Sequence, residues 1–458
     1  MNICEQLVEN ILSTRFETFD KETIEHSKNR IIDVIGCLIA GASLPPSPMI
    51  VDMVREWGGK EESTILVHGG RAPAHNVGMV NTIMARLLDF DPISPIVDGK
   101  RNLIHLSATT VPTAFAVAEC NGVGGKELIT AMILGDDLAA RIMAAAEHHA
   151  DLGWEPMGTT PAFGAAAIAG RLGKFNEEQM LNALGLVLNQ IGGSVQNVFE
   201  GTHAFVLPQG LTARAGIFSA ELARRGFSGV KDVLLGKYGY FALYCQNSHP
   251  DVLTKELGEK FYADGSFKRY PSCGGTHGAI ECALEIIQKH DIETEDIGEV
   301  TLSVLPGSHE SFLGFLSQPF EIGDYPPATA KFNLRYSVAN ALLRKSSRVE
   351  HFTDKFIRDP KVGGLARKVK LIDLPPSGKL TTVLDIKMKD GREFSAVKDP
   401  SIEGPSGPLS KEELKDKFRS NVAVSNTVTG KNAEEALNMI EYLEEVDDIK
   451  QIINLLVT

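Results

Sequence analysis

Hydrophobic residues recur at helical spacing through the first half of the chain. Leu7, Val8, Ile11 and Leu12 would lie on one face of a helix. The same periodicity predicts further helices over residues 21–40, 75–90, 126–146 and 211–225. Asn176 with Gln179 three positions later is typical of a capping box that opens another helix, ending near residue 190. The first half of the chain is therefore predicted to be almost entirely helical.

One of these helices should be made almost entirely of small residues. The stretch 153–160 is broken by glycine and proline, and it is followed by a run of mostly small residues, Ala-Ala-Ala-Ile-Ala-Gly, over residues 165–170. Such a run favours a helix but offers too little side chain to build a core alone, so it should lie at the centre of a bundle. We expect Thr159 or Thr160 to cap this helix, whose positive end favours an anionic group nearby.

The hydrophobic pattern changes to strand periodicity between residues 298 and 398. Strands are predicted at 300–304 and 368–372, with a hairpin of 381–387 and 393–397 turned on Asp390-Gly391. Helical periodicity resumes at Lys411 and again over 432–457. We therefore predict a mainly α protein with a large helical domain, residues 1–262 and 408–458, and a smaller α+β domain, residues 263–407.

Composition excludes several classes of partner. The chain has 458 residues and a formal charge of -13, which disfavours nucleic acid and anionic membranes as partners. The N-terminus lacks the features of a signal peptide, and Asp33 interrupts the most apolar early run, so we expect a cytoplasmic protein. The six cysteines include no Cys-x-x-Cys pair, which favours reduced and mostly buried thiols.

Two acids and a histidine flank one junction between predicted helices. The helix over 75–90 runs into Asp89 and Asp91 at its end, and His105 comes after a polar loop. Two structural explanations are open: Asp91 before Pro92 is a usual turn opener, and Asp89 could cap a neighbouring helix. A metal site at His148 and His149 is disfavoured, because adjacent histidines on a helix point about 100° apart.

Several short motifs occur together in one order along the chain. They are Asp89-Phe90-Asp91, His105-Leu-Ser107, Gly153-Trp-Glu-Pro-Met-Gly-Thr-Thr160, Lys268-Arg-Tyr-Pro-Ser-Cys273 with His277, and Ala330-Lys-Phe-Asn-Leu-Arg-Tyr336. This ordered set resembles the MmgE/PrpD family, which includes 2-methylcitrate dehydratase, cis-aconitate decarboxylase and iminodisuccinate epimerase. The resemblance covers nearly the whole chain. It implies that the α+β domain is a lid, that the protein is a homodimer, and that it uses no metal or organic cofactor.

The resemblance also assigns roles to particular residues. Asp89, His105 and Lys268 match family active-site positions and are expected to be catalytic. Arg269 and His277 lie in or beside the same motif as Lys268 and are expected to bind substrate. His105 suits proton transfer because an ordinary histidine titrates near ~6.5, while Asp89 could fix its tautomer or act as an acid.

Two substitutions separate this chain from the family pattern. Glu155 stands where the family has histidine, and Phe205 stands where it has lysine. Both changes make the expected substrate-binding site less positive, so we predict a substrate less anionic than a tricarboxylate. Glu155 in a dry cleft would have a raised pKa and could serve as a second acid or base.

The shared chemistry of the family is the making or quenching of an enolate-like centre beside a carboxylate. That chemistry needs a base near the carbon and fixed positive charge at the carboxylate. We expect a lyase of the dehydratase type acting on a small carboxylic acid. The alternatives are an epimerase, isomerase or decarboxylase, or a homologue that binds a metabolite without catalysis.

Overall fold

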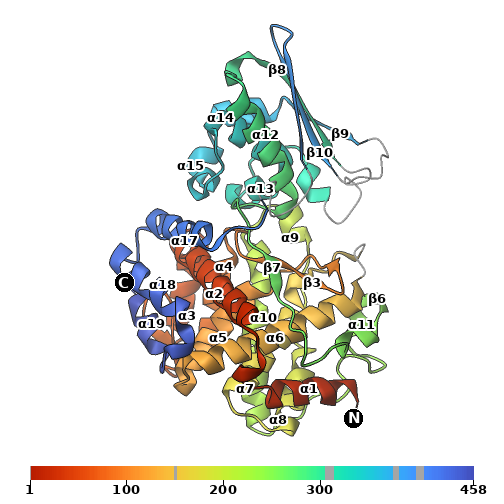
Figure 1. The fold of residues 1–458 in the computed structure, drawn as a ribbon, viewed down its shortest axis with the longest axis vertical. Coiled ribbons are helices and arrows are strands. Elements are labelled where there is room, and N and C mark those ends of the chain that lie inside the picture. The colour runs from red at the N-terminus through yellow and green to blue at the C-terminus, as the bar shows by residue number, and fades with distance from the viewer. Residues whose placement is uncertain (1, 149–151, 305–313, 375–380, 399–406, 458) are drawn as a thin grey trace.

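The fold is mainly α-helical with small β-sheets (Figure 1). A computed structural model describes residues 2–148, 152–304, 314–374, 381–398 and 407–457. Among these residues no single helix is long and apolar enough to cross a membrane. The pair α2 (Lys21–Ala42) and α3 (Ser47–Trp57), bent by 88°, meets that criterion of length and composition only when its two helices are taken together.

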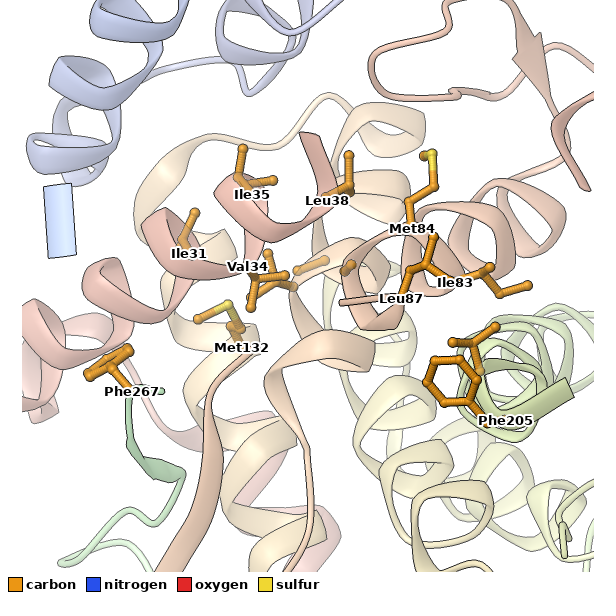
Figure 2. Close-up of a cluster of buried hydrophobic side chains, with 14 of the residues drawn as sticks. Ile31, Val34, Ile35, Leu38, Ile83, Met84, Leu87, Met132, Phe205 and Phe267 are labelled. Atoms are coloured by element: carbon orange, nitrogen blue, oxygen red, sulfur yellow. The ribbon is translucent and has the colours of Figure 1, made fainter. Parts of the chain in front are cut away.

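A bundle of helices forms most of the buried core. Its members besides α2 are α1 (Ile3–Ser13), α4 (Ala74–Arg86), α5 (Ser107–Asn121), α6 (Gly125–Ala145), α7 (Pro161–Leu172), α8 (Glu177–Val187) and α10 (Leu207–Arg224). Figure 2 shows part of this core, where Ile31, Val34 and Leu38 of α2 share a cluster of buried side chains with residues of α4. These elements match the predicted helical periodicity within a few residues at each end.

The small-residue helix α7 lies at the centre of the bundle, as predicted. It packs against α5, α6, α8 and α10. A Cβ added to Gly164 would lie 2.7 Å from the carbonyl oxygen of Gly135 on α6, so the two backbones touch. The expected threonine cap is wrong: Thr160 makes no capping hydrogen bond, and Thr159 Oγ1 donates to the carbonyl of Pro156 instead. The capping box of Asn176 and Gln179 is confirmed.

The predicted strands form one four-stranded sheet in the order β11-β10-β8-β9. The strands are β8 (Ile297–Val304), β9 (Val369–Asp373), β10 (Thr382–Met388) and β11 (Glu393–Lys398). β10 is antiparallel to both β8 and β11, whereas β9 is parallel to β8. Helix α12 (His277–Lys289) packs on β10 and β11, and α14 (Leu334–Arg344) packs on α12. Figure 1 shows this sheet and its helices at one end of the molecule.

The chain then returns to its N-terminal half. Helix α17 (Lys411–Ser425) packs along α2, and α18 (Gly430–Glu441) also contacts α2 (Figure 1). Helix α19 (Lys450–Leu455) follows, and Val457 forms a parallel bridge with Val67. The domain boundaries at residues 262 and 408 stay a prediction.

The remaining elements are short. The helices are α9 (Gln196–Phe199), α11 (Tyr240–Tyr244), α13 (Pro326–Lys331), α15 (Asp354–Ile357) and α16 (Pro360–Ala366). The strands are β1 (Ser63–Thr64), β2 (Arg71–Ala72), β3 (Ile93–Val97), β4 (Lys100–Arg101), β5 (Ala146–His148), β6 (Cys245–Ser248) and β7 (Asp264–Ser266).

The segment before His105 differs from its prediction as a polar loop. It contains the mostly buried strand β3, in which Ile93 pairs with Ser266 and Pro95 pairs with Asp264 of β7. Pro95 and Ser94, which has a left-handed φ of 68°, interrupt the strand pattern, so this strand was not predicted from the sequence. The pairing places the loop after α4 beside the segment that leads into Lys268.

Candidate active site

The site begins where helix α4 ends at Arg86. The backbone N–H of Asp89 donates to the carbonyl of Arg86, and Asp89 has the left-handed φ of 51°. Aspartate tolerates this conformation better than most residues. The resulting turn lets Arg86 reach both neighbouring acids, since its Nη1 contacts Asp89 and lies 3.5 Å from Oδ1 of Asp91.

Lys268 joins this turn from the segment after β7. Its Nζ lies 2.9 Å from Oδ1 of Asp89 and donates to the backbone carbonyl of Asp89 at 2.7 Å. Burial by itself would raise the pKa of Asp89, but the charges of Arg86 and Lys268 outweigh it and hold that pKa well below its usual range. Asp89 is therefore a fixed anion, which argues against its expected use as a proton donor.

His105 is oriented by Asp91. The His105 Nδ1 lies 2.7 Å from Oδ2 of Asp91. Burial would raise the pKa of Asp91, yet His105 and Arg86 lower it overall, so the carboxylate accepts and Nδ1 carries the proton. The tautomer-fixing role that the sequence suggested for Asp89 thus belongs to Asp91.

The other ring nitrogen of His105, Nε2, carries no proton in this tautomer. Burial, followed by the charge of Arg86, lowers the pKa of His105 to about 4, so the ring is neutral near neutral pH. Its Nε2 then carries a lone pair and lies 3.6 Å from Oδ1 of Asp89. The backbone carbonyl of His105 accepts a hydrogen bond of 2.7 Å from Gln209, which fixes the start of this segment.

Glu155 lies in the loop before α7 and is electrostatically coupled to the same cluster. Its backbone N–H donates to Gly193 at 3.3 Å, and only 4% of the residue is exposed. Burial raises the pKa of Glu155 to about 7, with Arg86 opposing the rise and Asp89 adding to it. The residue can therefore hold or release a proton near neutral pH, as predicted for a dry cleft.

Phe205 lies beside a buried lysine. Its ring packs edge-on against Phe332 with centroids 5.4 Å apart, and Nζ of Lys331 lies 6.0 Å from the ring centroid. Figure 2 shows Phe205 in the same hydrophobic cluster as Ile83 and Leu87. Phe205 therefore places an apolar ring at the position where the family pattern has a charged lysine.

Lys331 brings a third cation to the cluster. Its Nζ donates to the carbonyl of Leu87 at 2.7 Å, two residues before Asp89. Burial lowers the pKa of Lys331 to about 7, while the charge of Asp89 opposes the shift. Lys331 lies in the motif 330–336 that carries part of the family resemblance, but the motif alone does not show that its lysine reaches the Asp89 turn.

The structure does not bring Arg269 and His277 into these contacts. Arg269 pairs with Glu413 of α17 at 2.9 Å, whereas the adjacent Lys268 contacts Asp89. His277 is buried at the start of α12, where its Nε2 lies 3.2 Å from the carbonyl oxygen of Tyr270. Their expected role in binding substrate stays a prediction.

Asp89, Asp91 and His105 also form a geometric candidate for a cation site. One ligand atom from each lies within 4.8 Å of the others. However, Arg86 and Lys268 already place positive charge on Asp89, and His105 directs its Nδ1 proton to Asp91. A bound cation would have to compete with both side chains, so the donor set fits an ion pair better than a metal.

Comparison with known proteins identifies the family. The MmgE/PrpD N-terminal domain matches residues 5–253, and the MmgE/PrpD C-terminal domain matches residues 270–445. The chain is 25% identical to a cis-aconitate decarboxylase of Homo sapiens over 453 residues, covering 94% of this chain and 90% of the relative. It is 24% identical to a cis-aconitate decarboxylase of Aspergillus terreus, with 95% and 92% covered. The chain belongs to the MmgE/PrpD family.

Proposed function

We propose that this protein is a lyase of the dehydratase type that acts on a small carboxylic acid. The observation that carries the proposal is the neutral His105, whose Nδ1 proton is held by Asp91 and whose Nε2 is left basic in a buried, charged site. A base in such a place suits the removal of a proton from the carbon beside a carboxylate. The relatives that bear the name cis-aconitate decarboxylase support an enzyme that works on carboxylic acids.

In the proposed reaction Nε2 of His105 takes the proton, and the C–H electron pair moves toward the adjacent carboxylate. The positive charges of Lys331, Lys268 and Arg86 stabilise the enolate-like charge in the low-dielectric site. Glu155 in its protonated form gives a proton to the leaving hydroxyl group. The C–O bond then breaks, a carbon–carbon double bond forms, and water leaves.

The charge of the site supports a weakly anionic substrate. The cluster holds three cationic side chains, Arg86, Lys268 and Lys331, against three carboxylates, Asp89, Asp91 and Glu155. With all six ionised the charges cancel, and protonation of Glu155 leaves one positive charge. This balance suits a mono- or dicarboxylic acid better than a tricarboxylate.

Epimerisation is the second candidate function. It is favoured by the pKa of Glu155 near 7, since a two-base epimerase needs a second group that can return a proton. In that case His105 removes the proton and Glu155 delivers one to the same carbon, with no bond to oxygen broken. A homologue that binds a metabolite without catalysis would do neither.

Proton NMR in deuterium oxide tests these alternatives. The protein is incubated with malate, aspartate, citrate, 2-methylcitrate and cis-aconitate, with His105→Gln as the control that lacks the base. Elimination to an unsaturated acid supports the lyase, and deuterium uptake without elimination supports the epimerase. If none of the acids reacts although one of them raises the thermal unfolding midpoint, the protein is a binding homologue and the proposal is wrong.

We further propose a homodimer that works in the cytoplasm without a metal or organic cofactor and without a nucleic-acid or membrane partner. Exposed Leu207, Leu211 and Phe218 on α10 support a protein partner, since large apolar side chains on one helix usually mark an interface. The proposal that no metal is used is supported by Arg86 and Lys268, whose positive charges already contact Asp89. Reaction rates that survive dialysis against EDTA are expected.

A further inference from the structure

A buried lysine of the C-terminal helix contacts both segments that carry the site. Lys417 on α17 is 8% exposed, and its Nζ donates to the carbonyl of Phe90 at 2.7 Å and to the carbonyl of Lys268 at 3.0 Å. Phe90 lies between Asp89 and Asp91, so one ammonium group bridges the acidic turn and the segment that carries the site lysine.

The surroundings of this ammonium group leave it little freedom. Its Nζ lies 2.7 Å from Oδ1 of the buried Asp33 on α2, and 3.7 Å from the ring centroid of Phe90. An ion pair in such a place costs desolvation energy, which its mutual attraction rarely exceeds. An apolar contact between α2 and α17 would stabilise the fold at least as well. Stability alone therefore does not explain why Lys417 and Asp33 are buried here.

We propose that Lys417 is a positioning residue, which holds the Asp89–Asp91 turn and the Lys268 segment at the spacing that catalysis requires. The inference rests on the proposed function for its catalytic meaning. A lysine suits the task because its ammonium group can donate to both carbonyls while its charge pairs with Asp33. Asp33 serves to neutralise the charge, whereas the two carbonyl contacts set the geometry.

This division of roles gives a test with three variants. Asp33→Asn keeps the ammonium group on both carbonyls. Asp33→Asn with Lys417→Met removes both charges together and so avoids leaving an unpaired buried carboxylate, but it also removes the two carbonyl contacts. Lys415→Met is the matched control, because Lys415 lies on the same helix and pairs with Glu441 at 2.8 Å.

The readout is the pKa of His105, measured by NMR on protein with 13C-labelled histidine and assigned by the signal lost in His105→Gln. In the double variant the loosened turn should admit water, so this pKa should rise from about 4 toward the ordinary value near ~6.5. In Lys415→Met it should stay unchanged, and in Asp33→Asn it should move far less than in the double variant. A folded double variant with the same His105 titration as Asp33→Asn would overturn the proposal.

Two additions keep the test decisive. If the methionine variant fails to fold, Asp33→Asn with Lys417→Gln replaces it. Because the glutamine side chain is one atom shorter than lysine, its amide nitrogen cannot hold both carbonyls at the distances that Nζ does, so the His105 pKa should still rise beyond that of Asp33→Asn. The absence of such a rise would count against the proposal. Because the titration uses no substrate, it reports on Lys417 even if no acid reacts. With a reacting acid, the double variant should lose about 10²-fold in rate.

Discussion

At the scale of single residues, burial decides which groups can exchange protons. His105 is neutral above about pH 4, because burial and Arg86 disfavour its charged form. Glu155 keeps its proton up to about pH 7 for the same reason of burial. Asp89 stays ionised because two cations contact it. The groups proposed as base and acid, His105 and Glu155, can therefore change their protonation state, whereas Asp89 keeps a fixed charge.

The rate of elimination should follow a bell-shaped dependence on pH. The acidic limb reflects protonation of His105 near 4, and the alkaline limb reflects loss of protons from Glu155 and Lys331 near 7. Initial rates measured across this range would check it. In Glu155→Gln, elimination should fall by about 10²- to 10⁴-fold while deuterium uptake persists. A rate that keeps rising above the pKa of Glu155 would contradict the assignment.

A change of charge at two positions should widen the range of substrates. Phe205→Lys with Glu155→His adds positive charge beside Lys331, which should strengthen binding of citrate or cis-aconitate. Near 4 Å, one such attraction is worth on the order of 4 kcal/mol at an effective dielectric of ~20 before desolvation reduces it. Isothermal titration with each acid checks the gain, and Phe205→Met serves as the uncharged control. Equal affinities in wild type and double variant would contradict this view of the two substitutions.

The sequence could name the site only in part. Asp89, His105 and Lys268 were accessible because they belong to motifs with an order along the chain. The role of Asp91 was not, because a following proline makes the residue look like a turn opener. The position of Arg269 could not be predicted either, since the sequence alone does not show which of two adjacent cations contacts Asp89.

At the scale of elements, close backbone contact fixes the bundle around α7. Gly164 of α7 and Gly135 of α6 meet at a distance that no side chain would permit. This contact holds α7 in place, and the loop with Glu155 leads directly into that helix. The position of the proposed acid therefore depends on glycines that have no chemical role in the proposed reaction.

Gly164→Ala should destabilise the protein by about 1 to 3 kcal/mol, because the added Cβ would lie 2.7 Å from a backbone oxygen that cannot move away. The midpoint of urea unfolding checks this. The matched control is Gly364→Ala in α16, where a Cβ meets nothing within 4 Å. There the change should be neutral or stabilise by about 0.5 to 1 kcal/mol. Equal midpoints for the two variants would contradict the proposed contact.

Sequence periodicity was sufficient for the long elements and insufficient for the short ones. Helices α2, α6 and α17 and the hairpin of β10 and β11 have repeating apolar faces that identify them locally. Strand β3 has no such signal, since Pro95 and Ser94 break its pattern and its partner β7 lies far along the chain. A strand that forms mainly because a distant segment pairs with it has little pattern in its own sequence from which to predict it.

At the scale of the whole molecule, the exposed face of α10 should bury itself against a second copy of the chain. Leu211 is 38% exposed and Phe218 is 40% exposed in one chain. Leu211→Glu with Phe218→Glu should convert a dimer into a monomer of 49.6 kDa, because a buried interface excludes unpaired charge. Sedimentation velocity checks the mass, with Met49→Glu on α3 as the control. A wild-type protein that sediments as a monomer would refute the proposed homodimer.

The contacts of Lys417 also bear on how the protein is made. Lys417 and Phe90 are separated by 327 residues. A chain growing on the ribosome therefore contains the Asp89–Asp91 turn long before it contains the lysine that contacts it. Until α17 has emerged, Asp33 lacks its counter-ion and the carbonyl of Phe90 lacks a donor. Non-local contacts of this kind form late, after the entropy of closing a long loop has been overcome. The nascent polypeptide therefore carries Asp89, Asp91 and His105 for most of its synthesis without the residues that complete the candidate site.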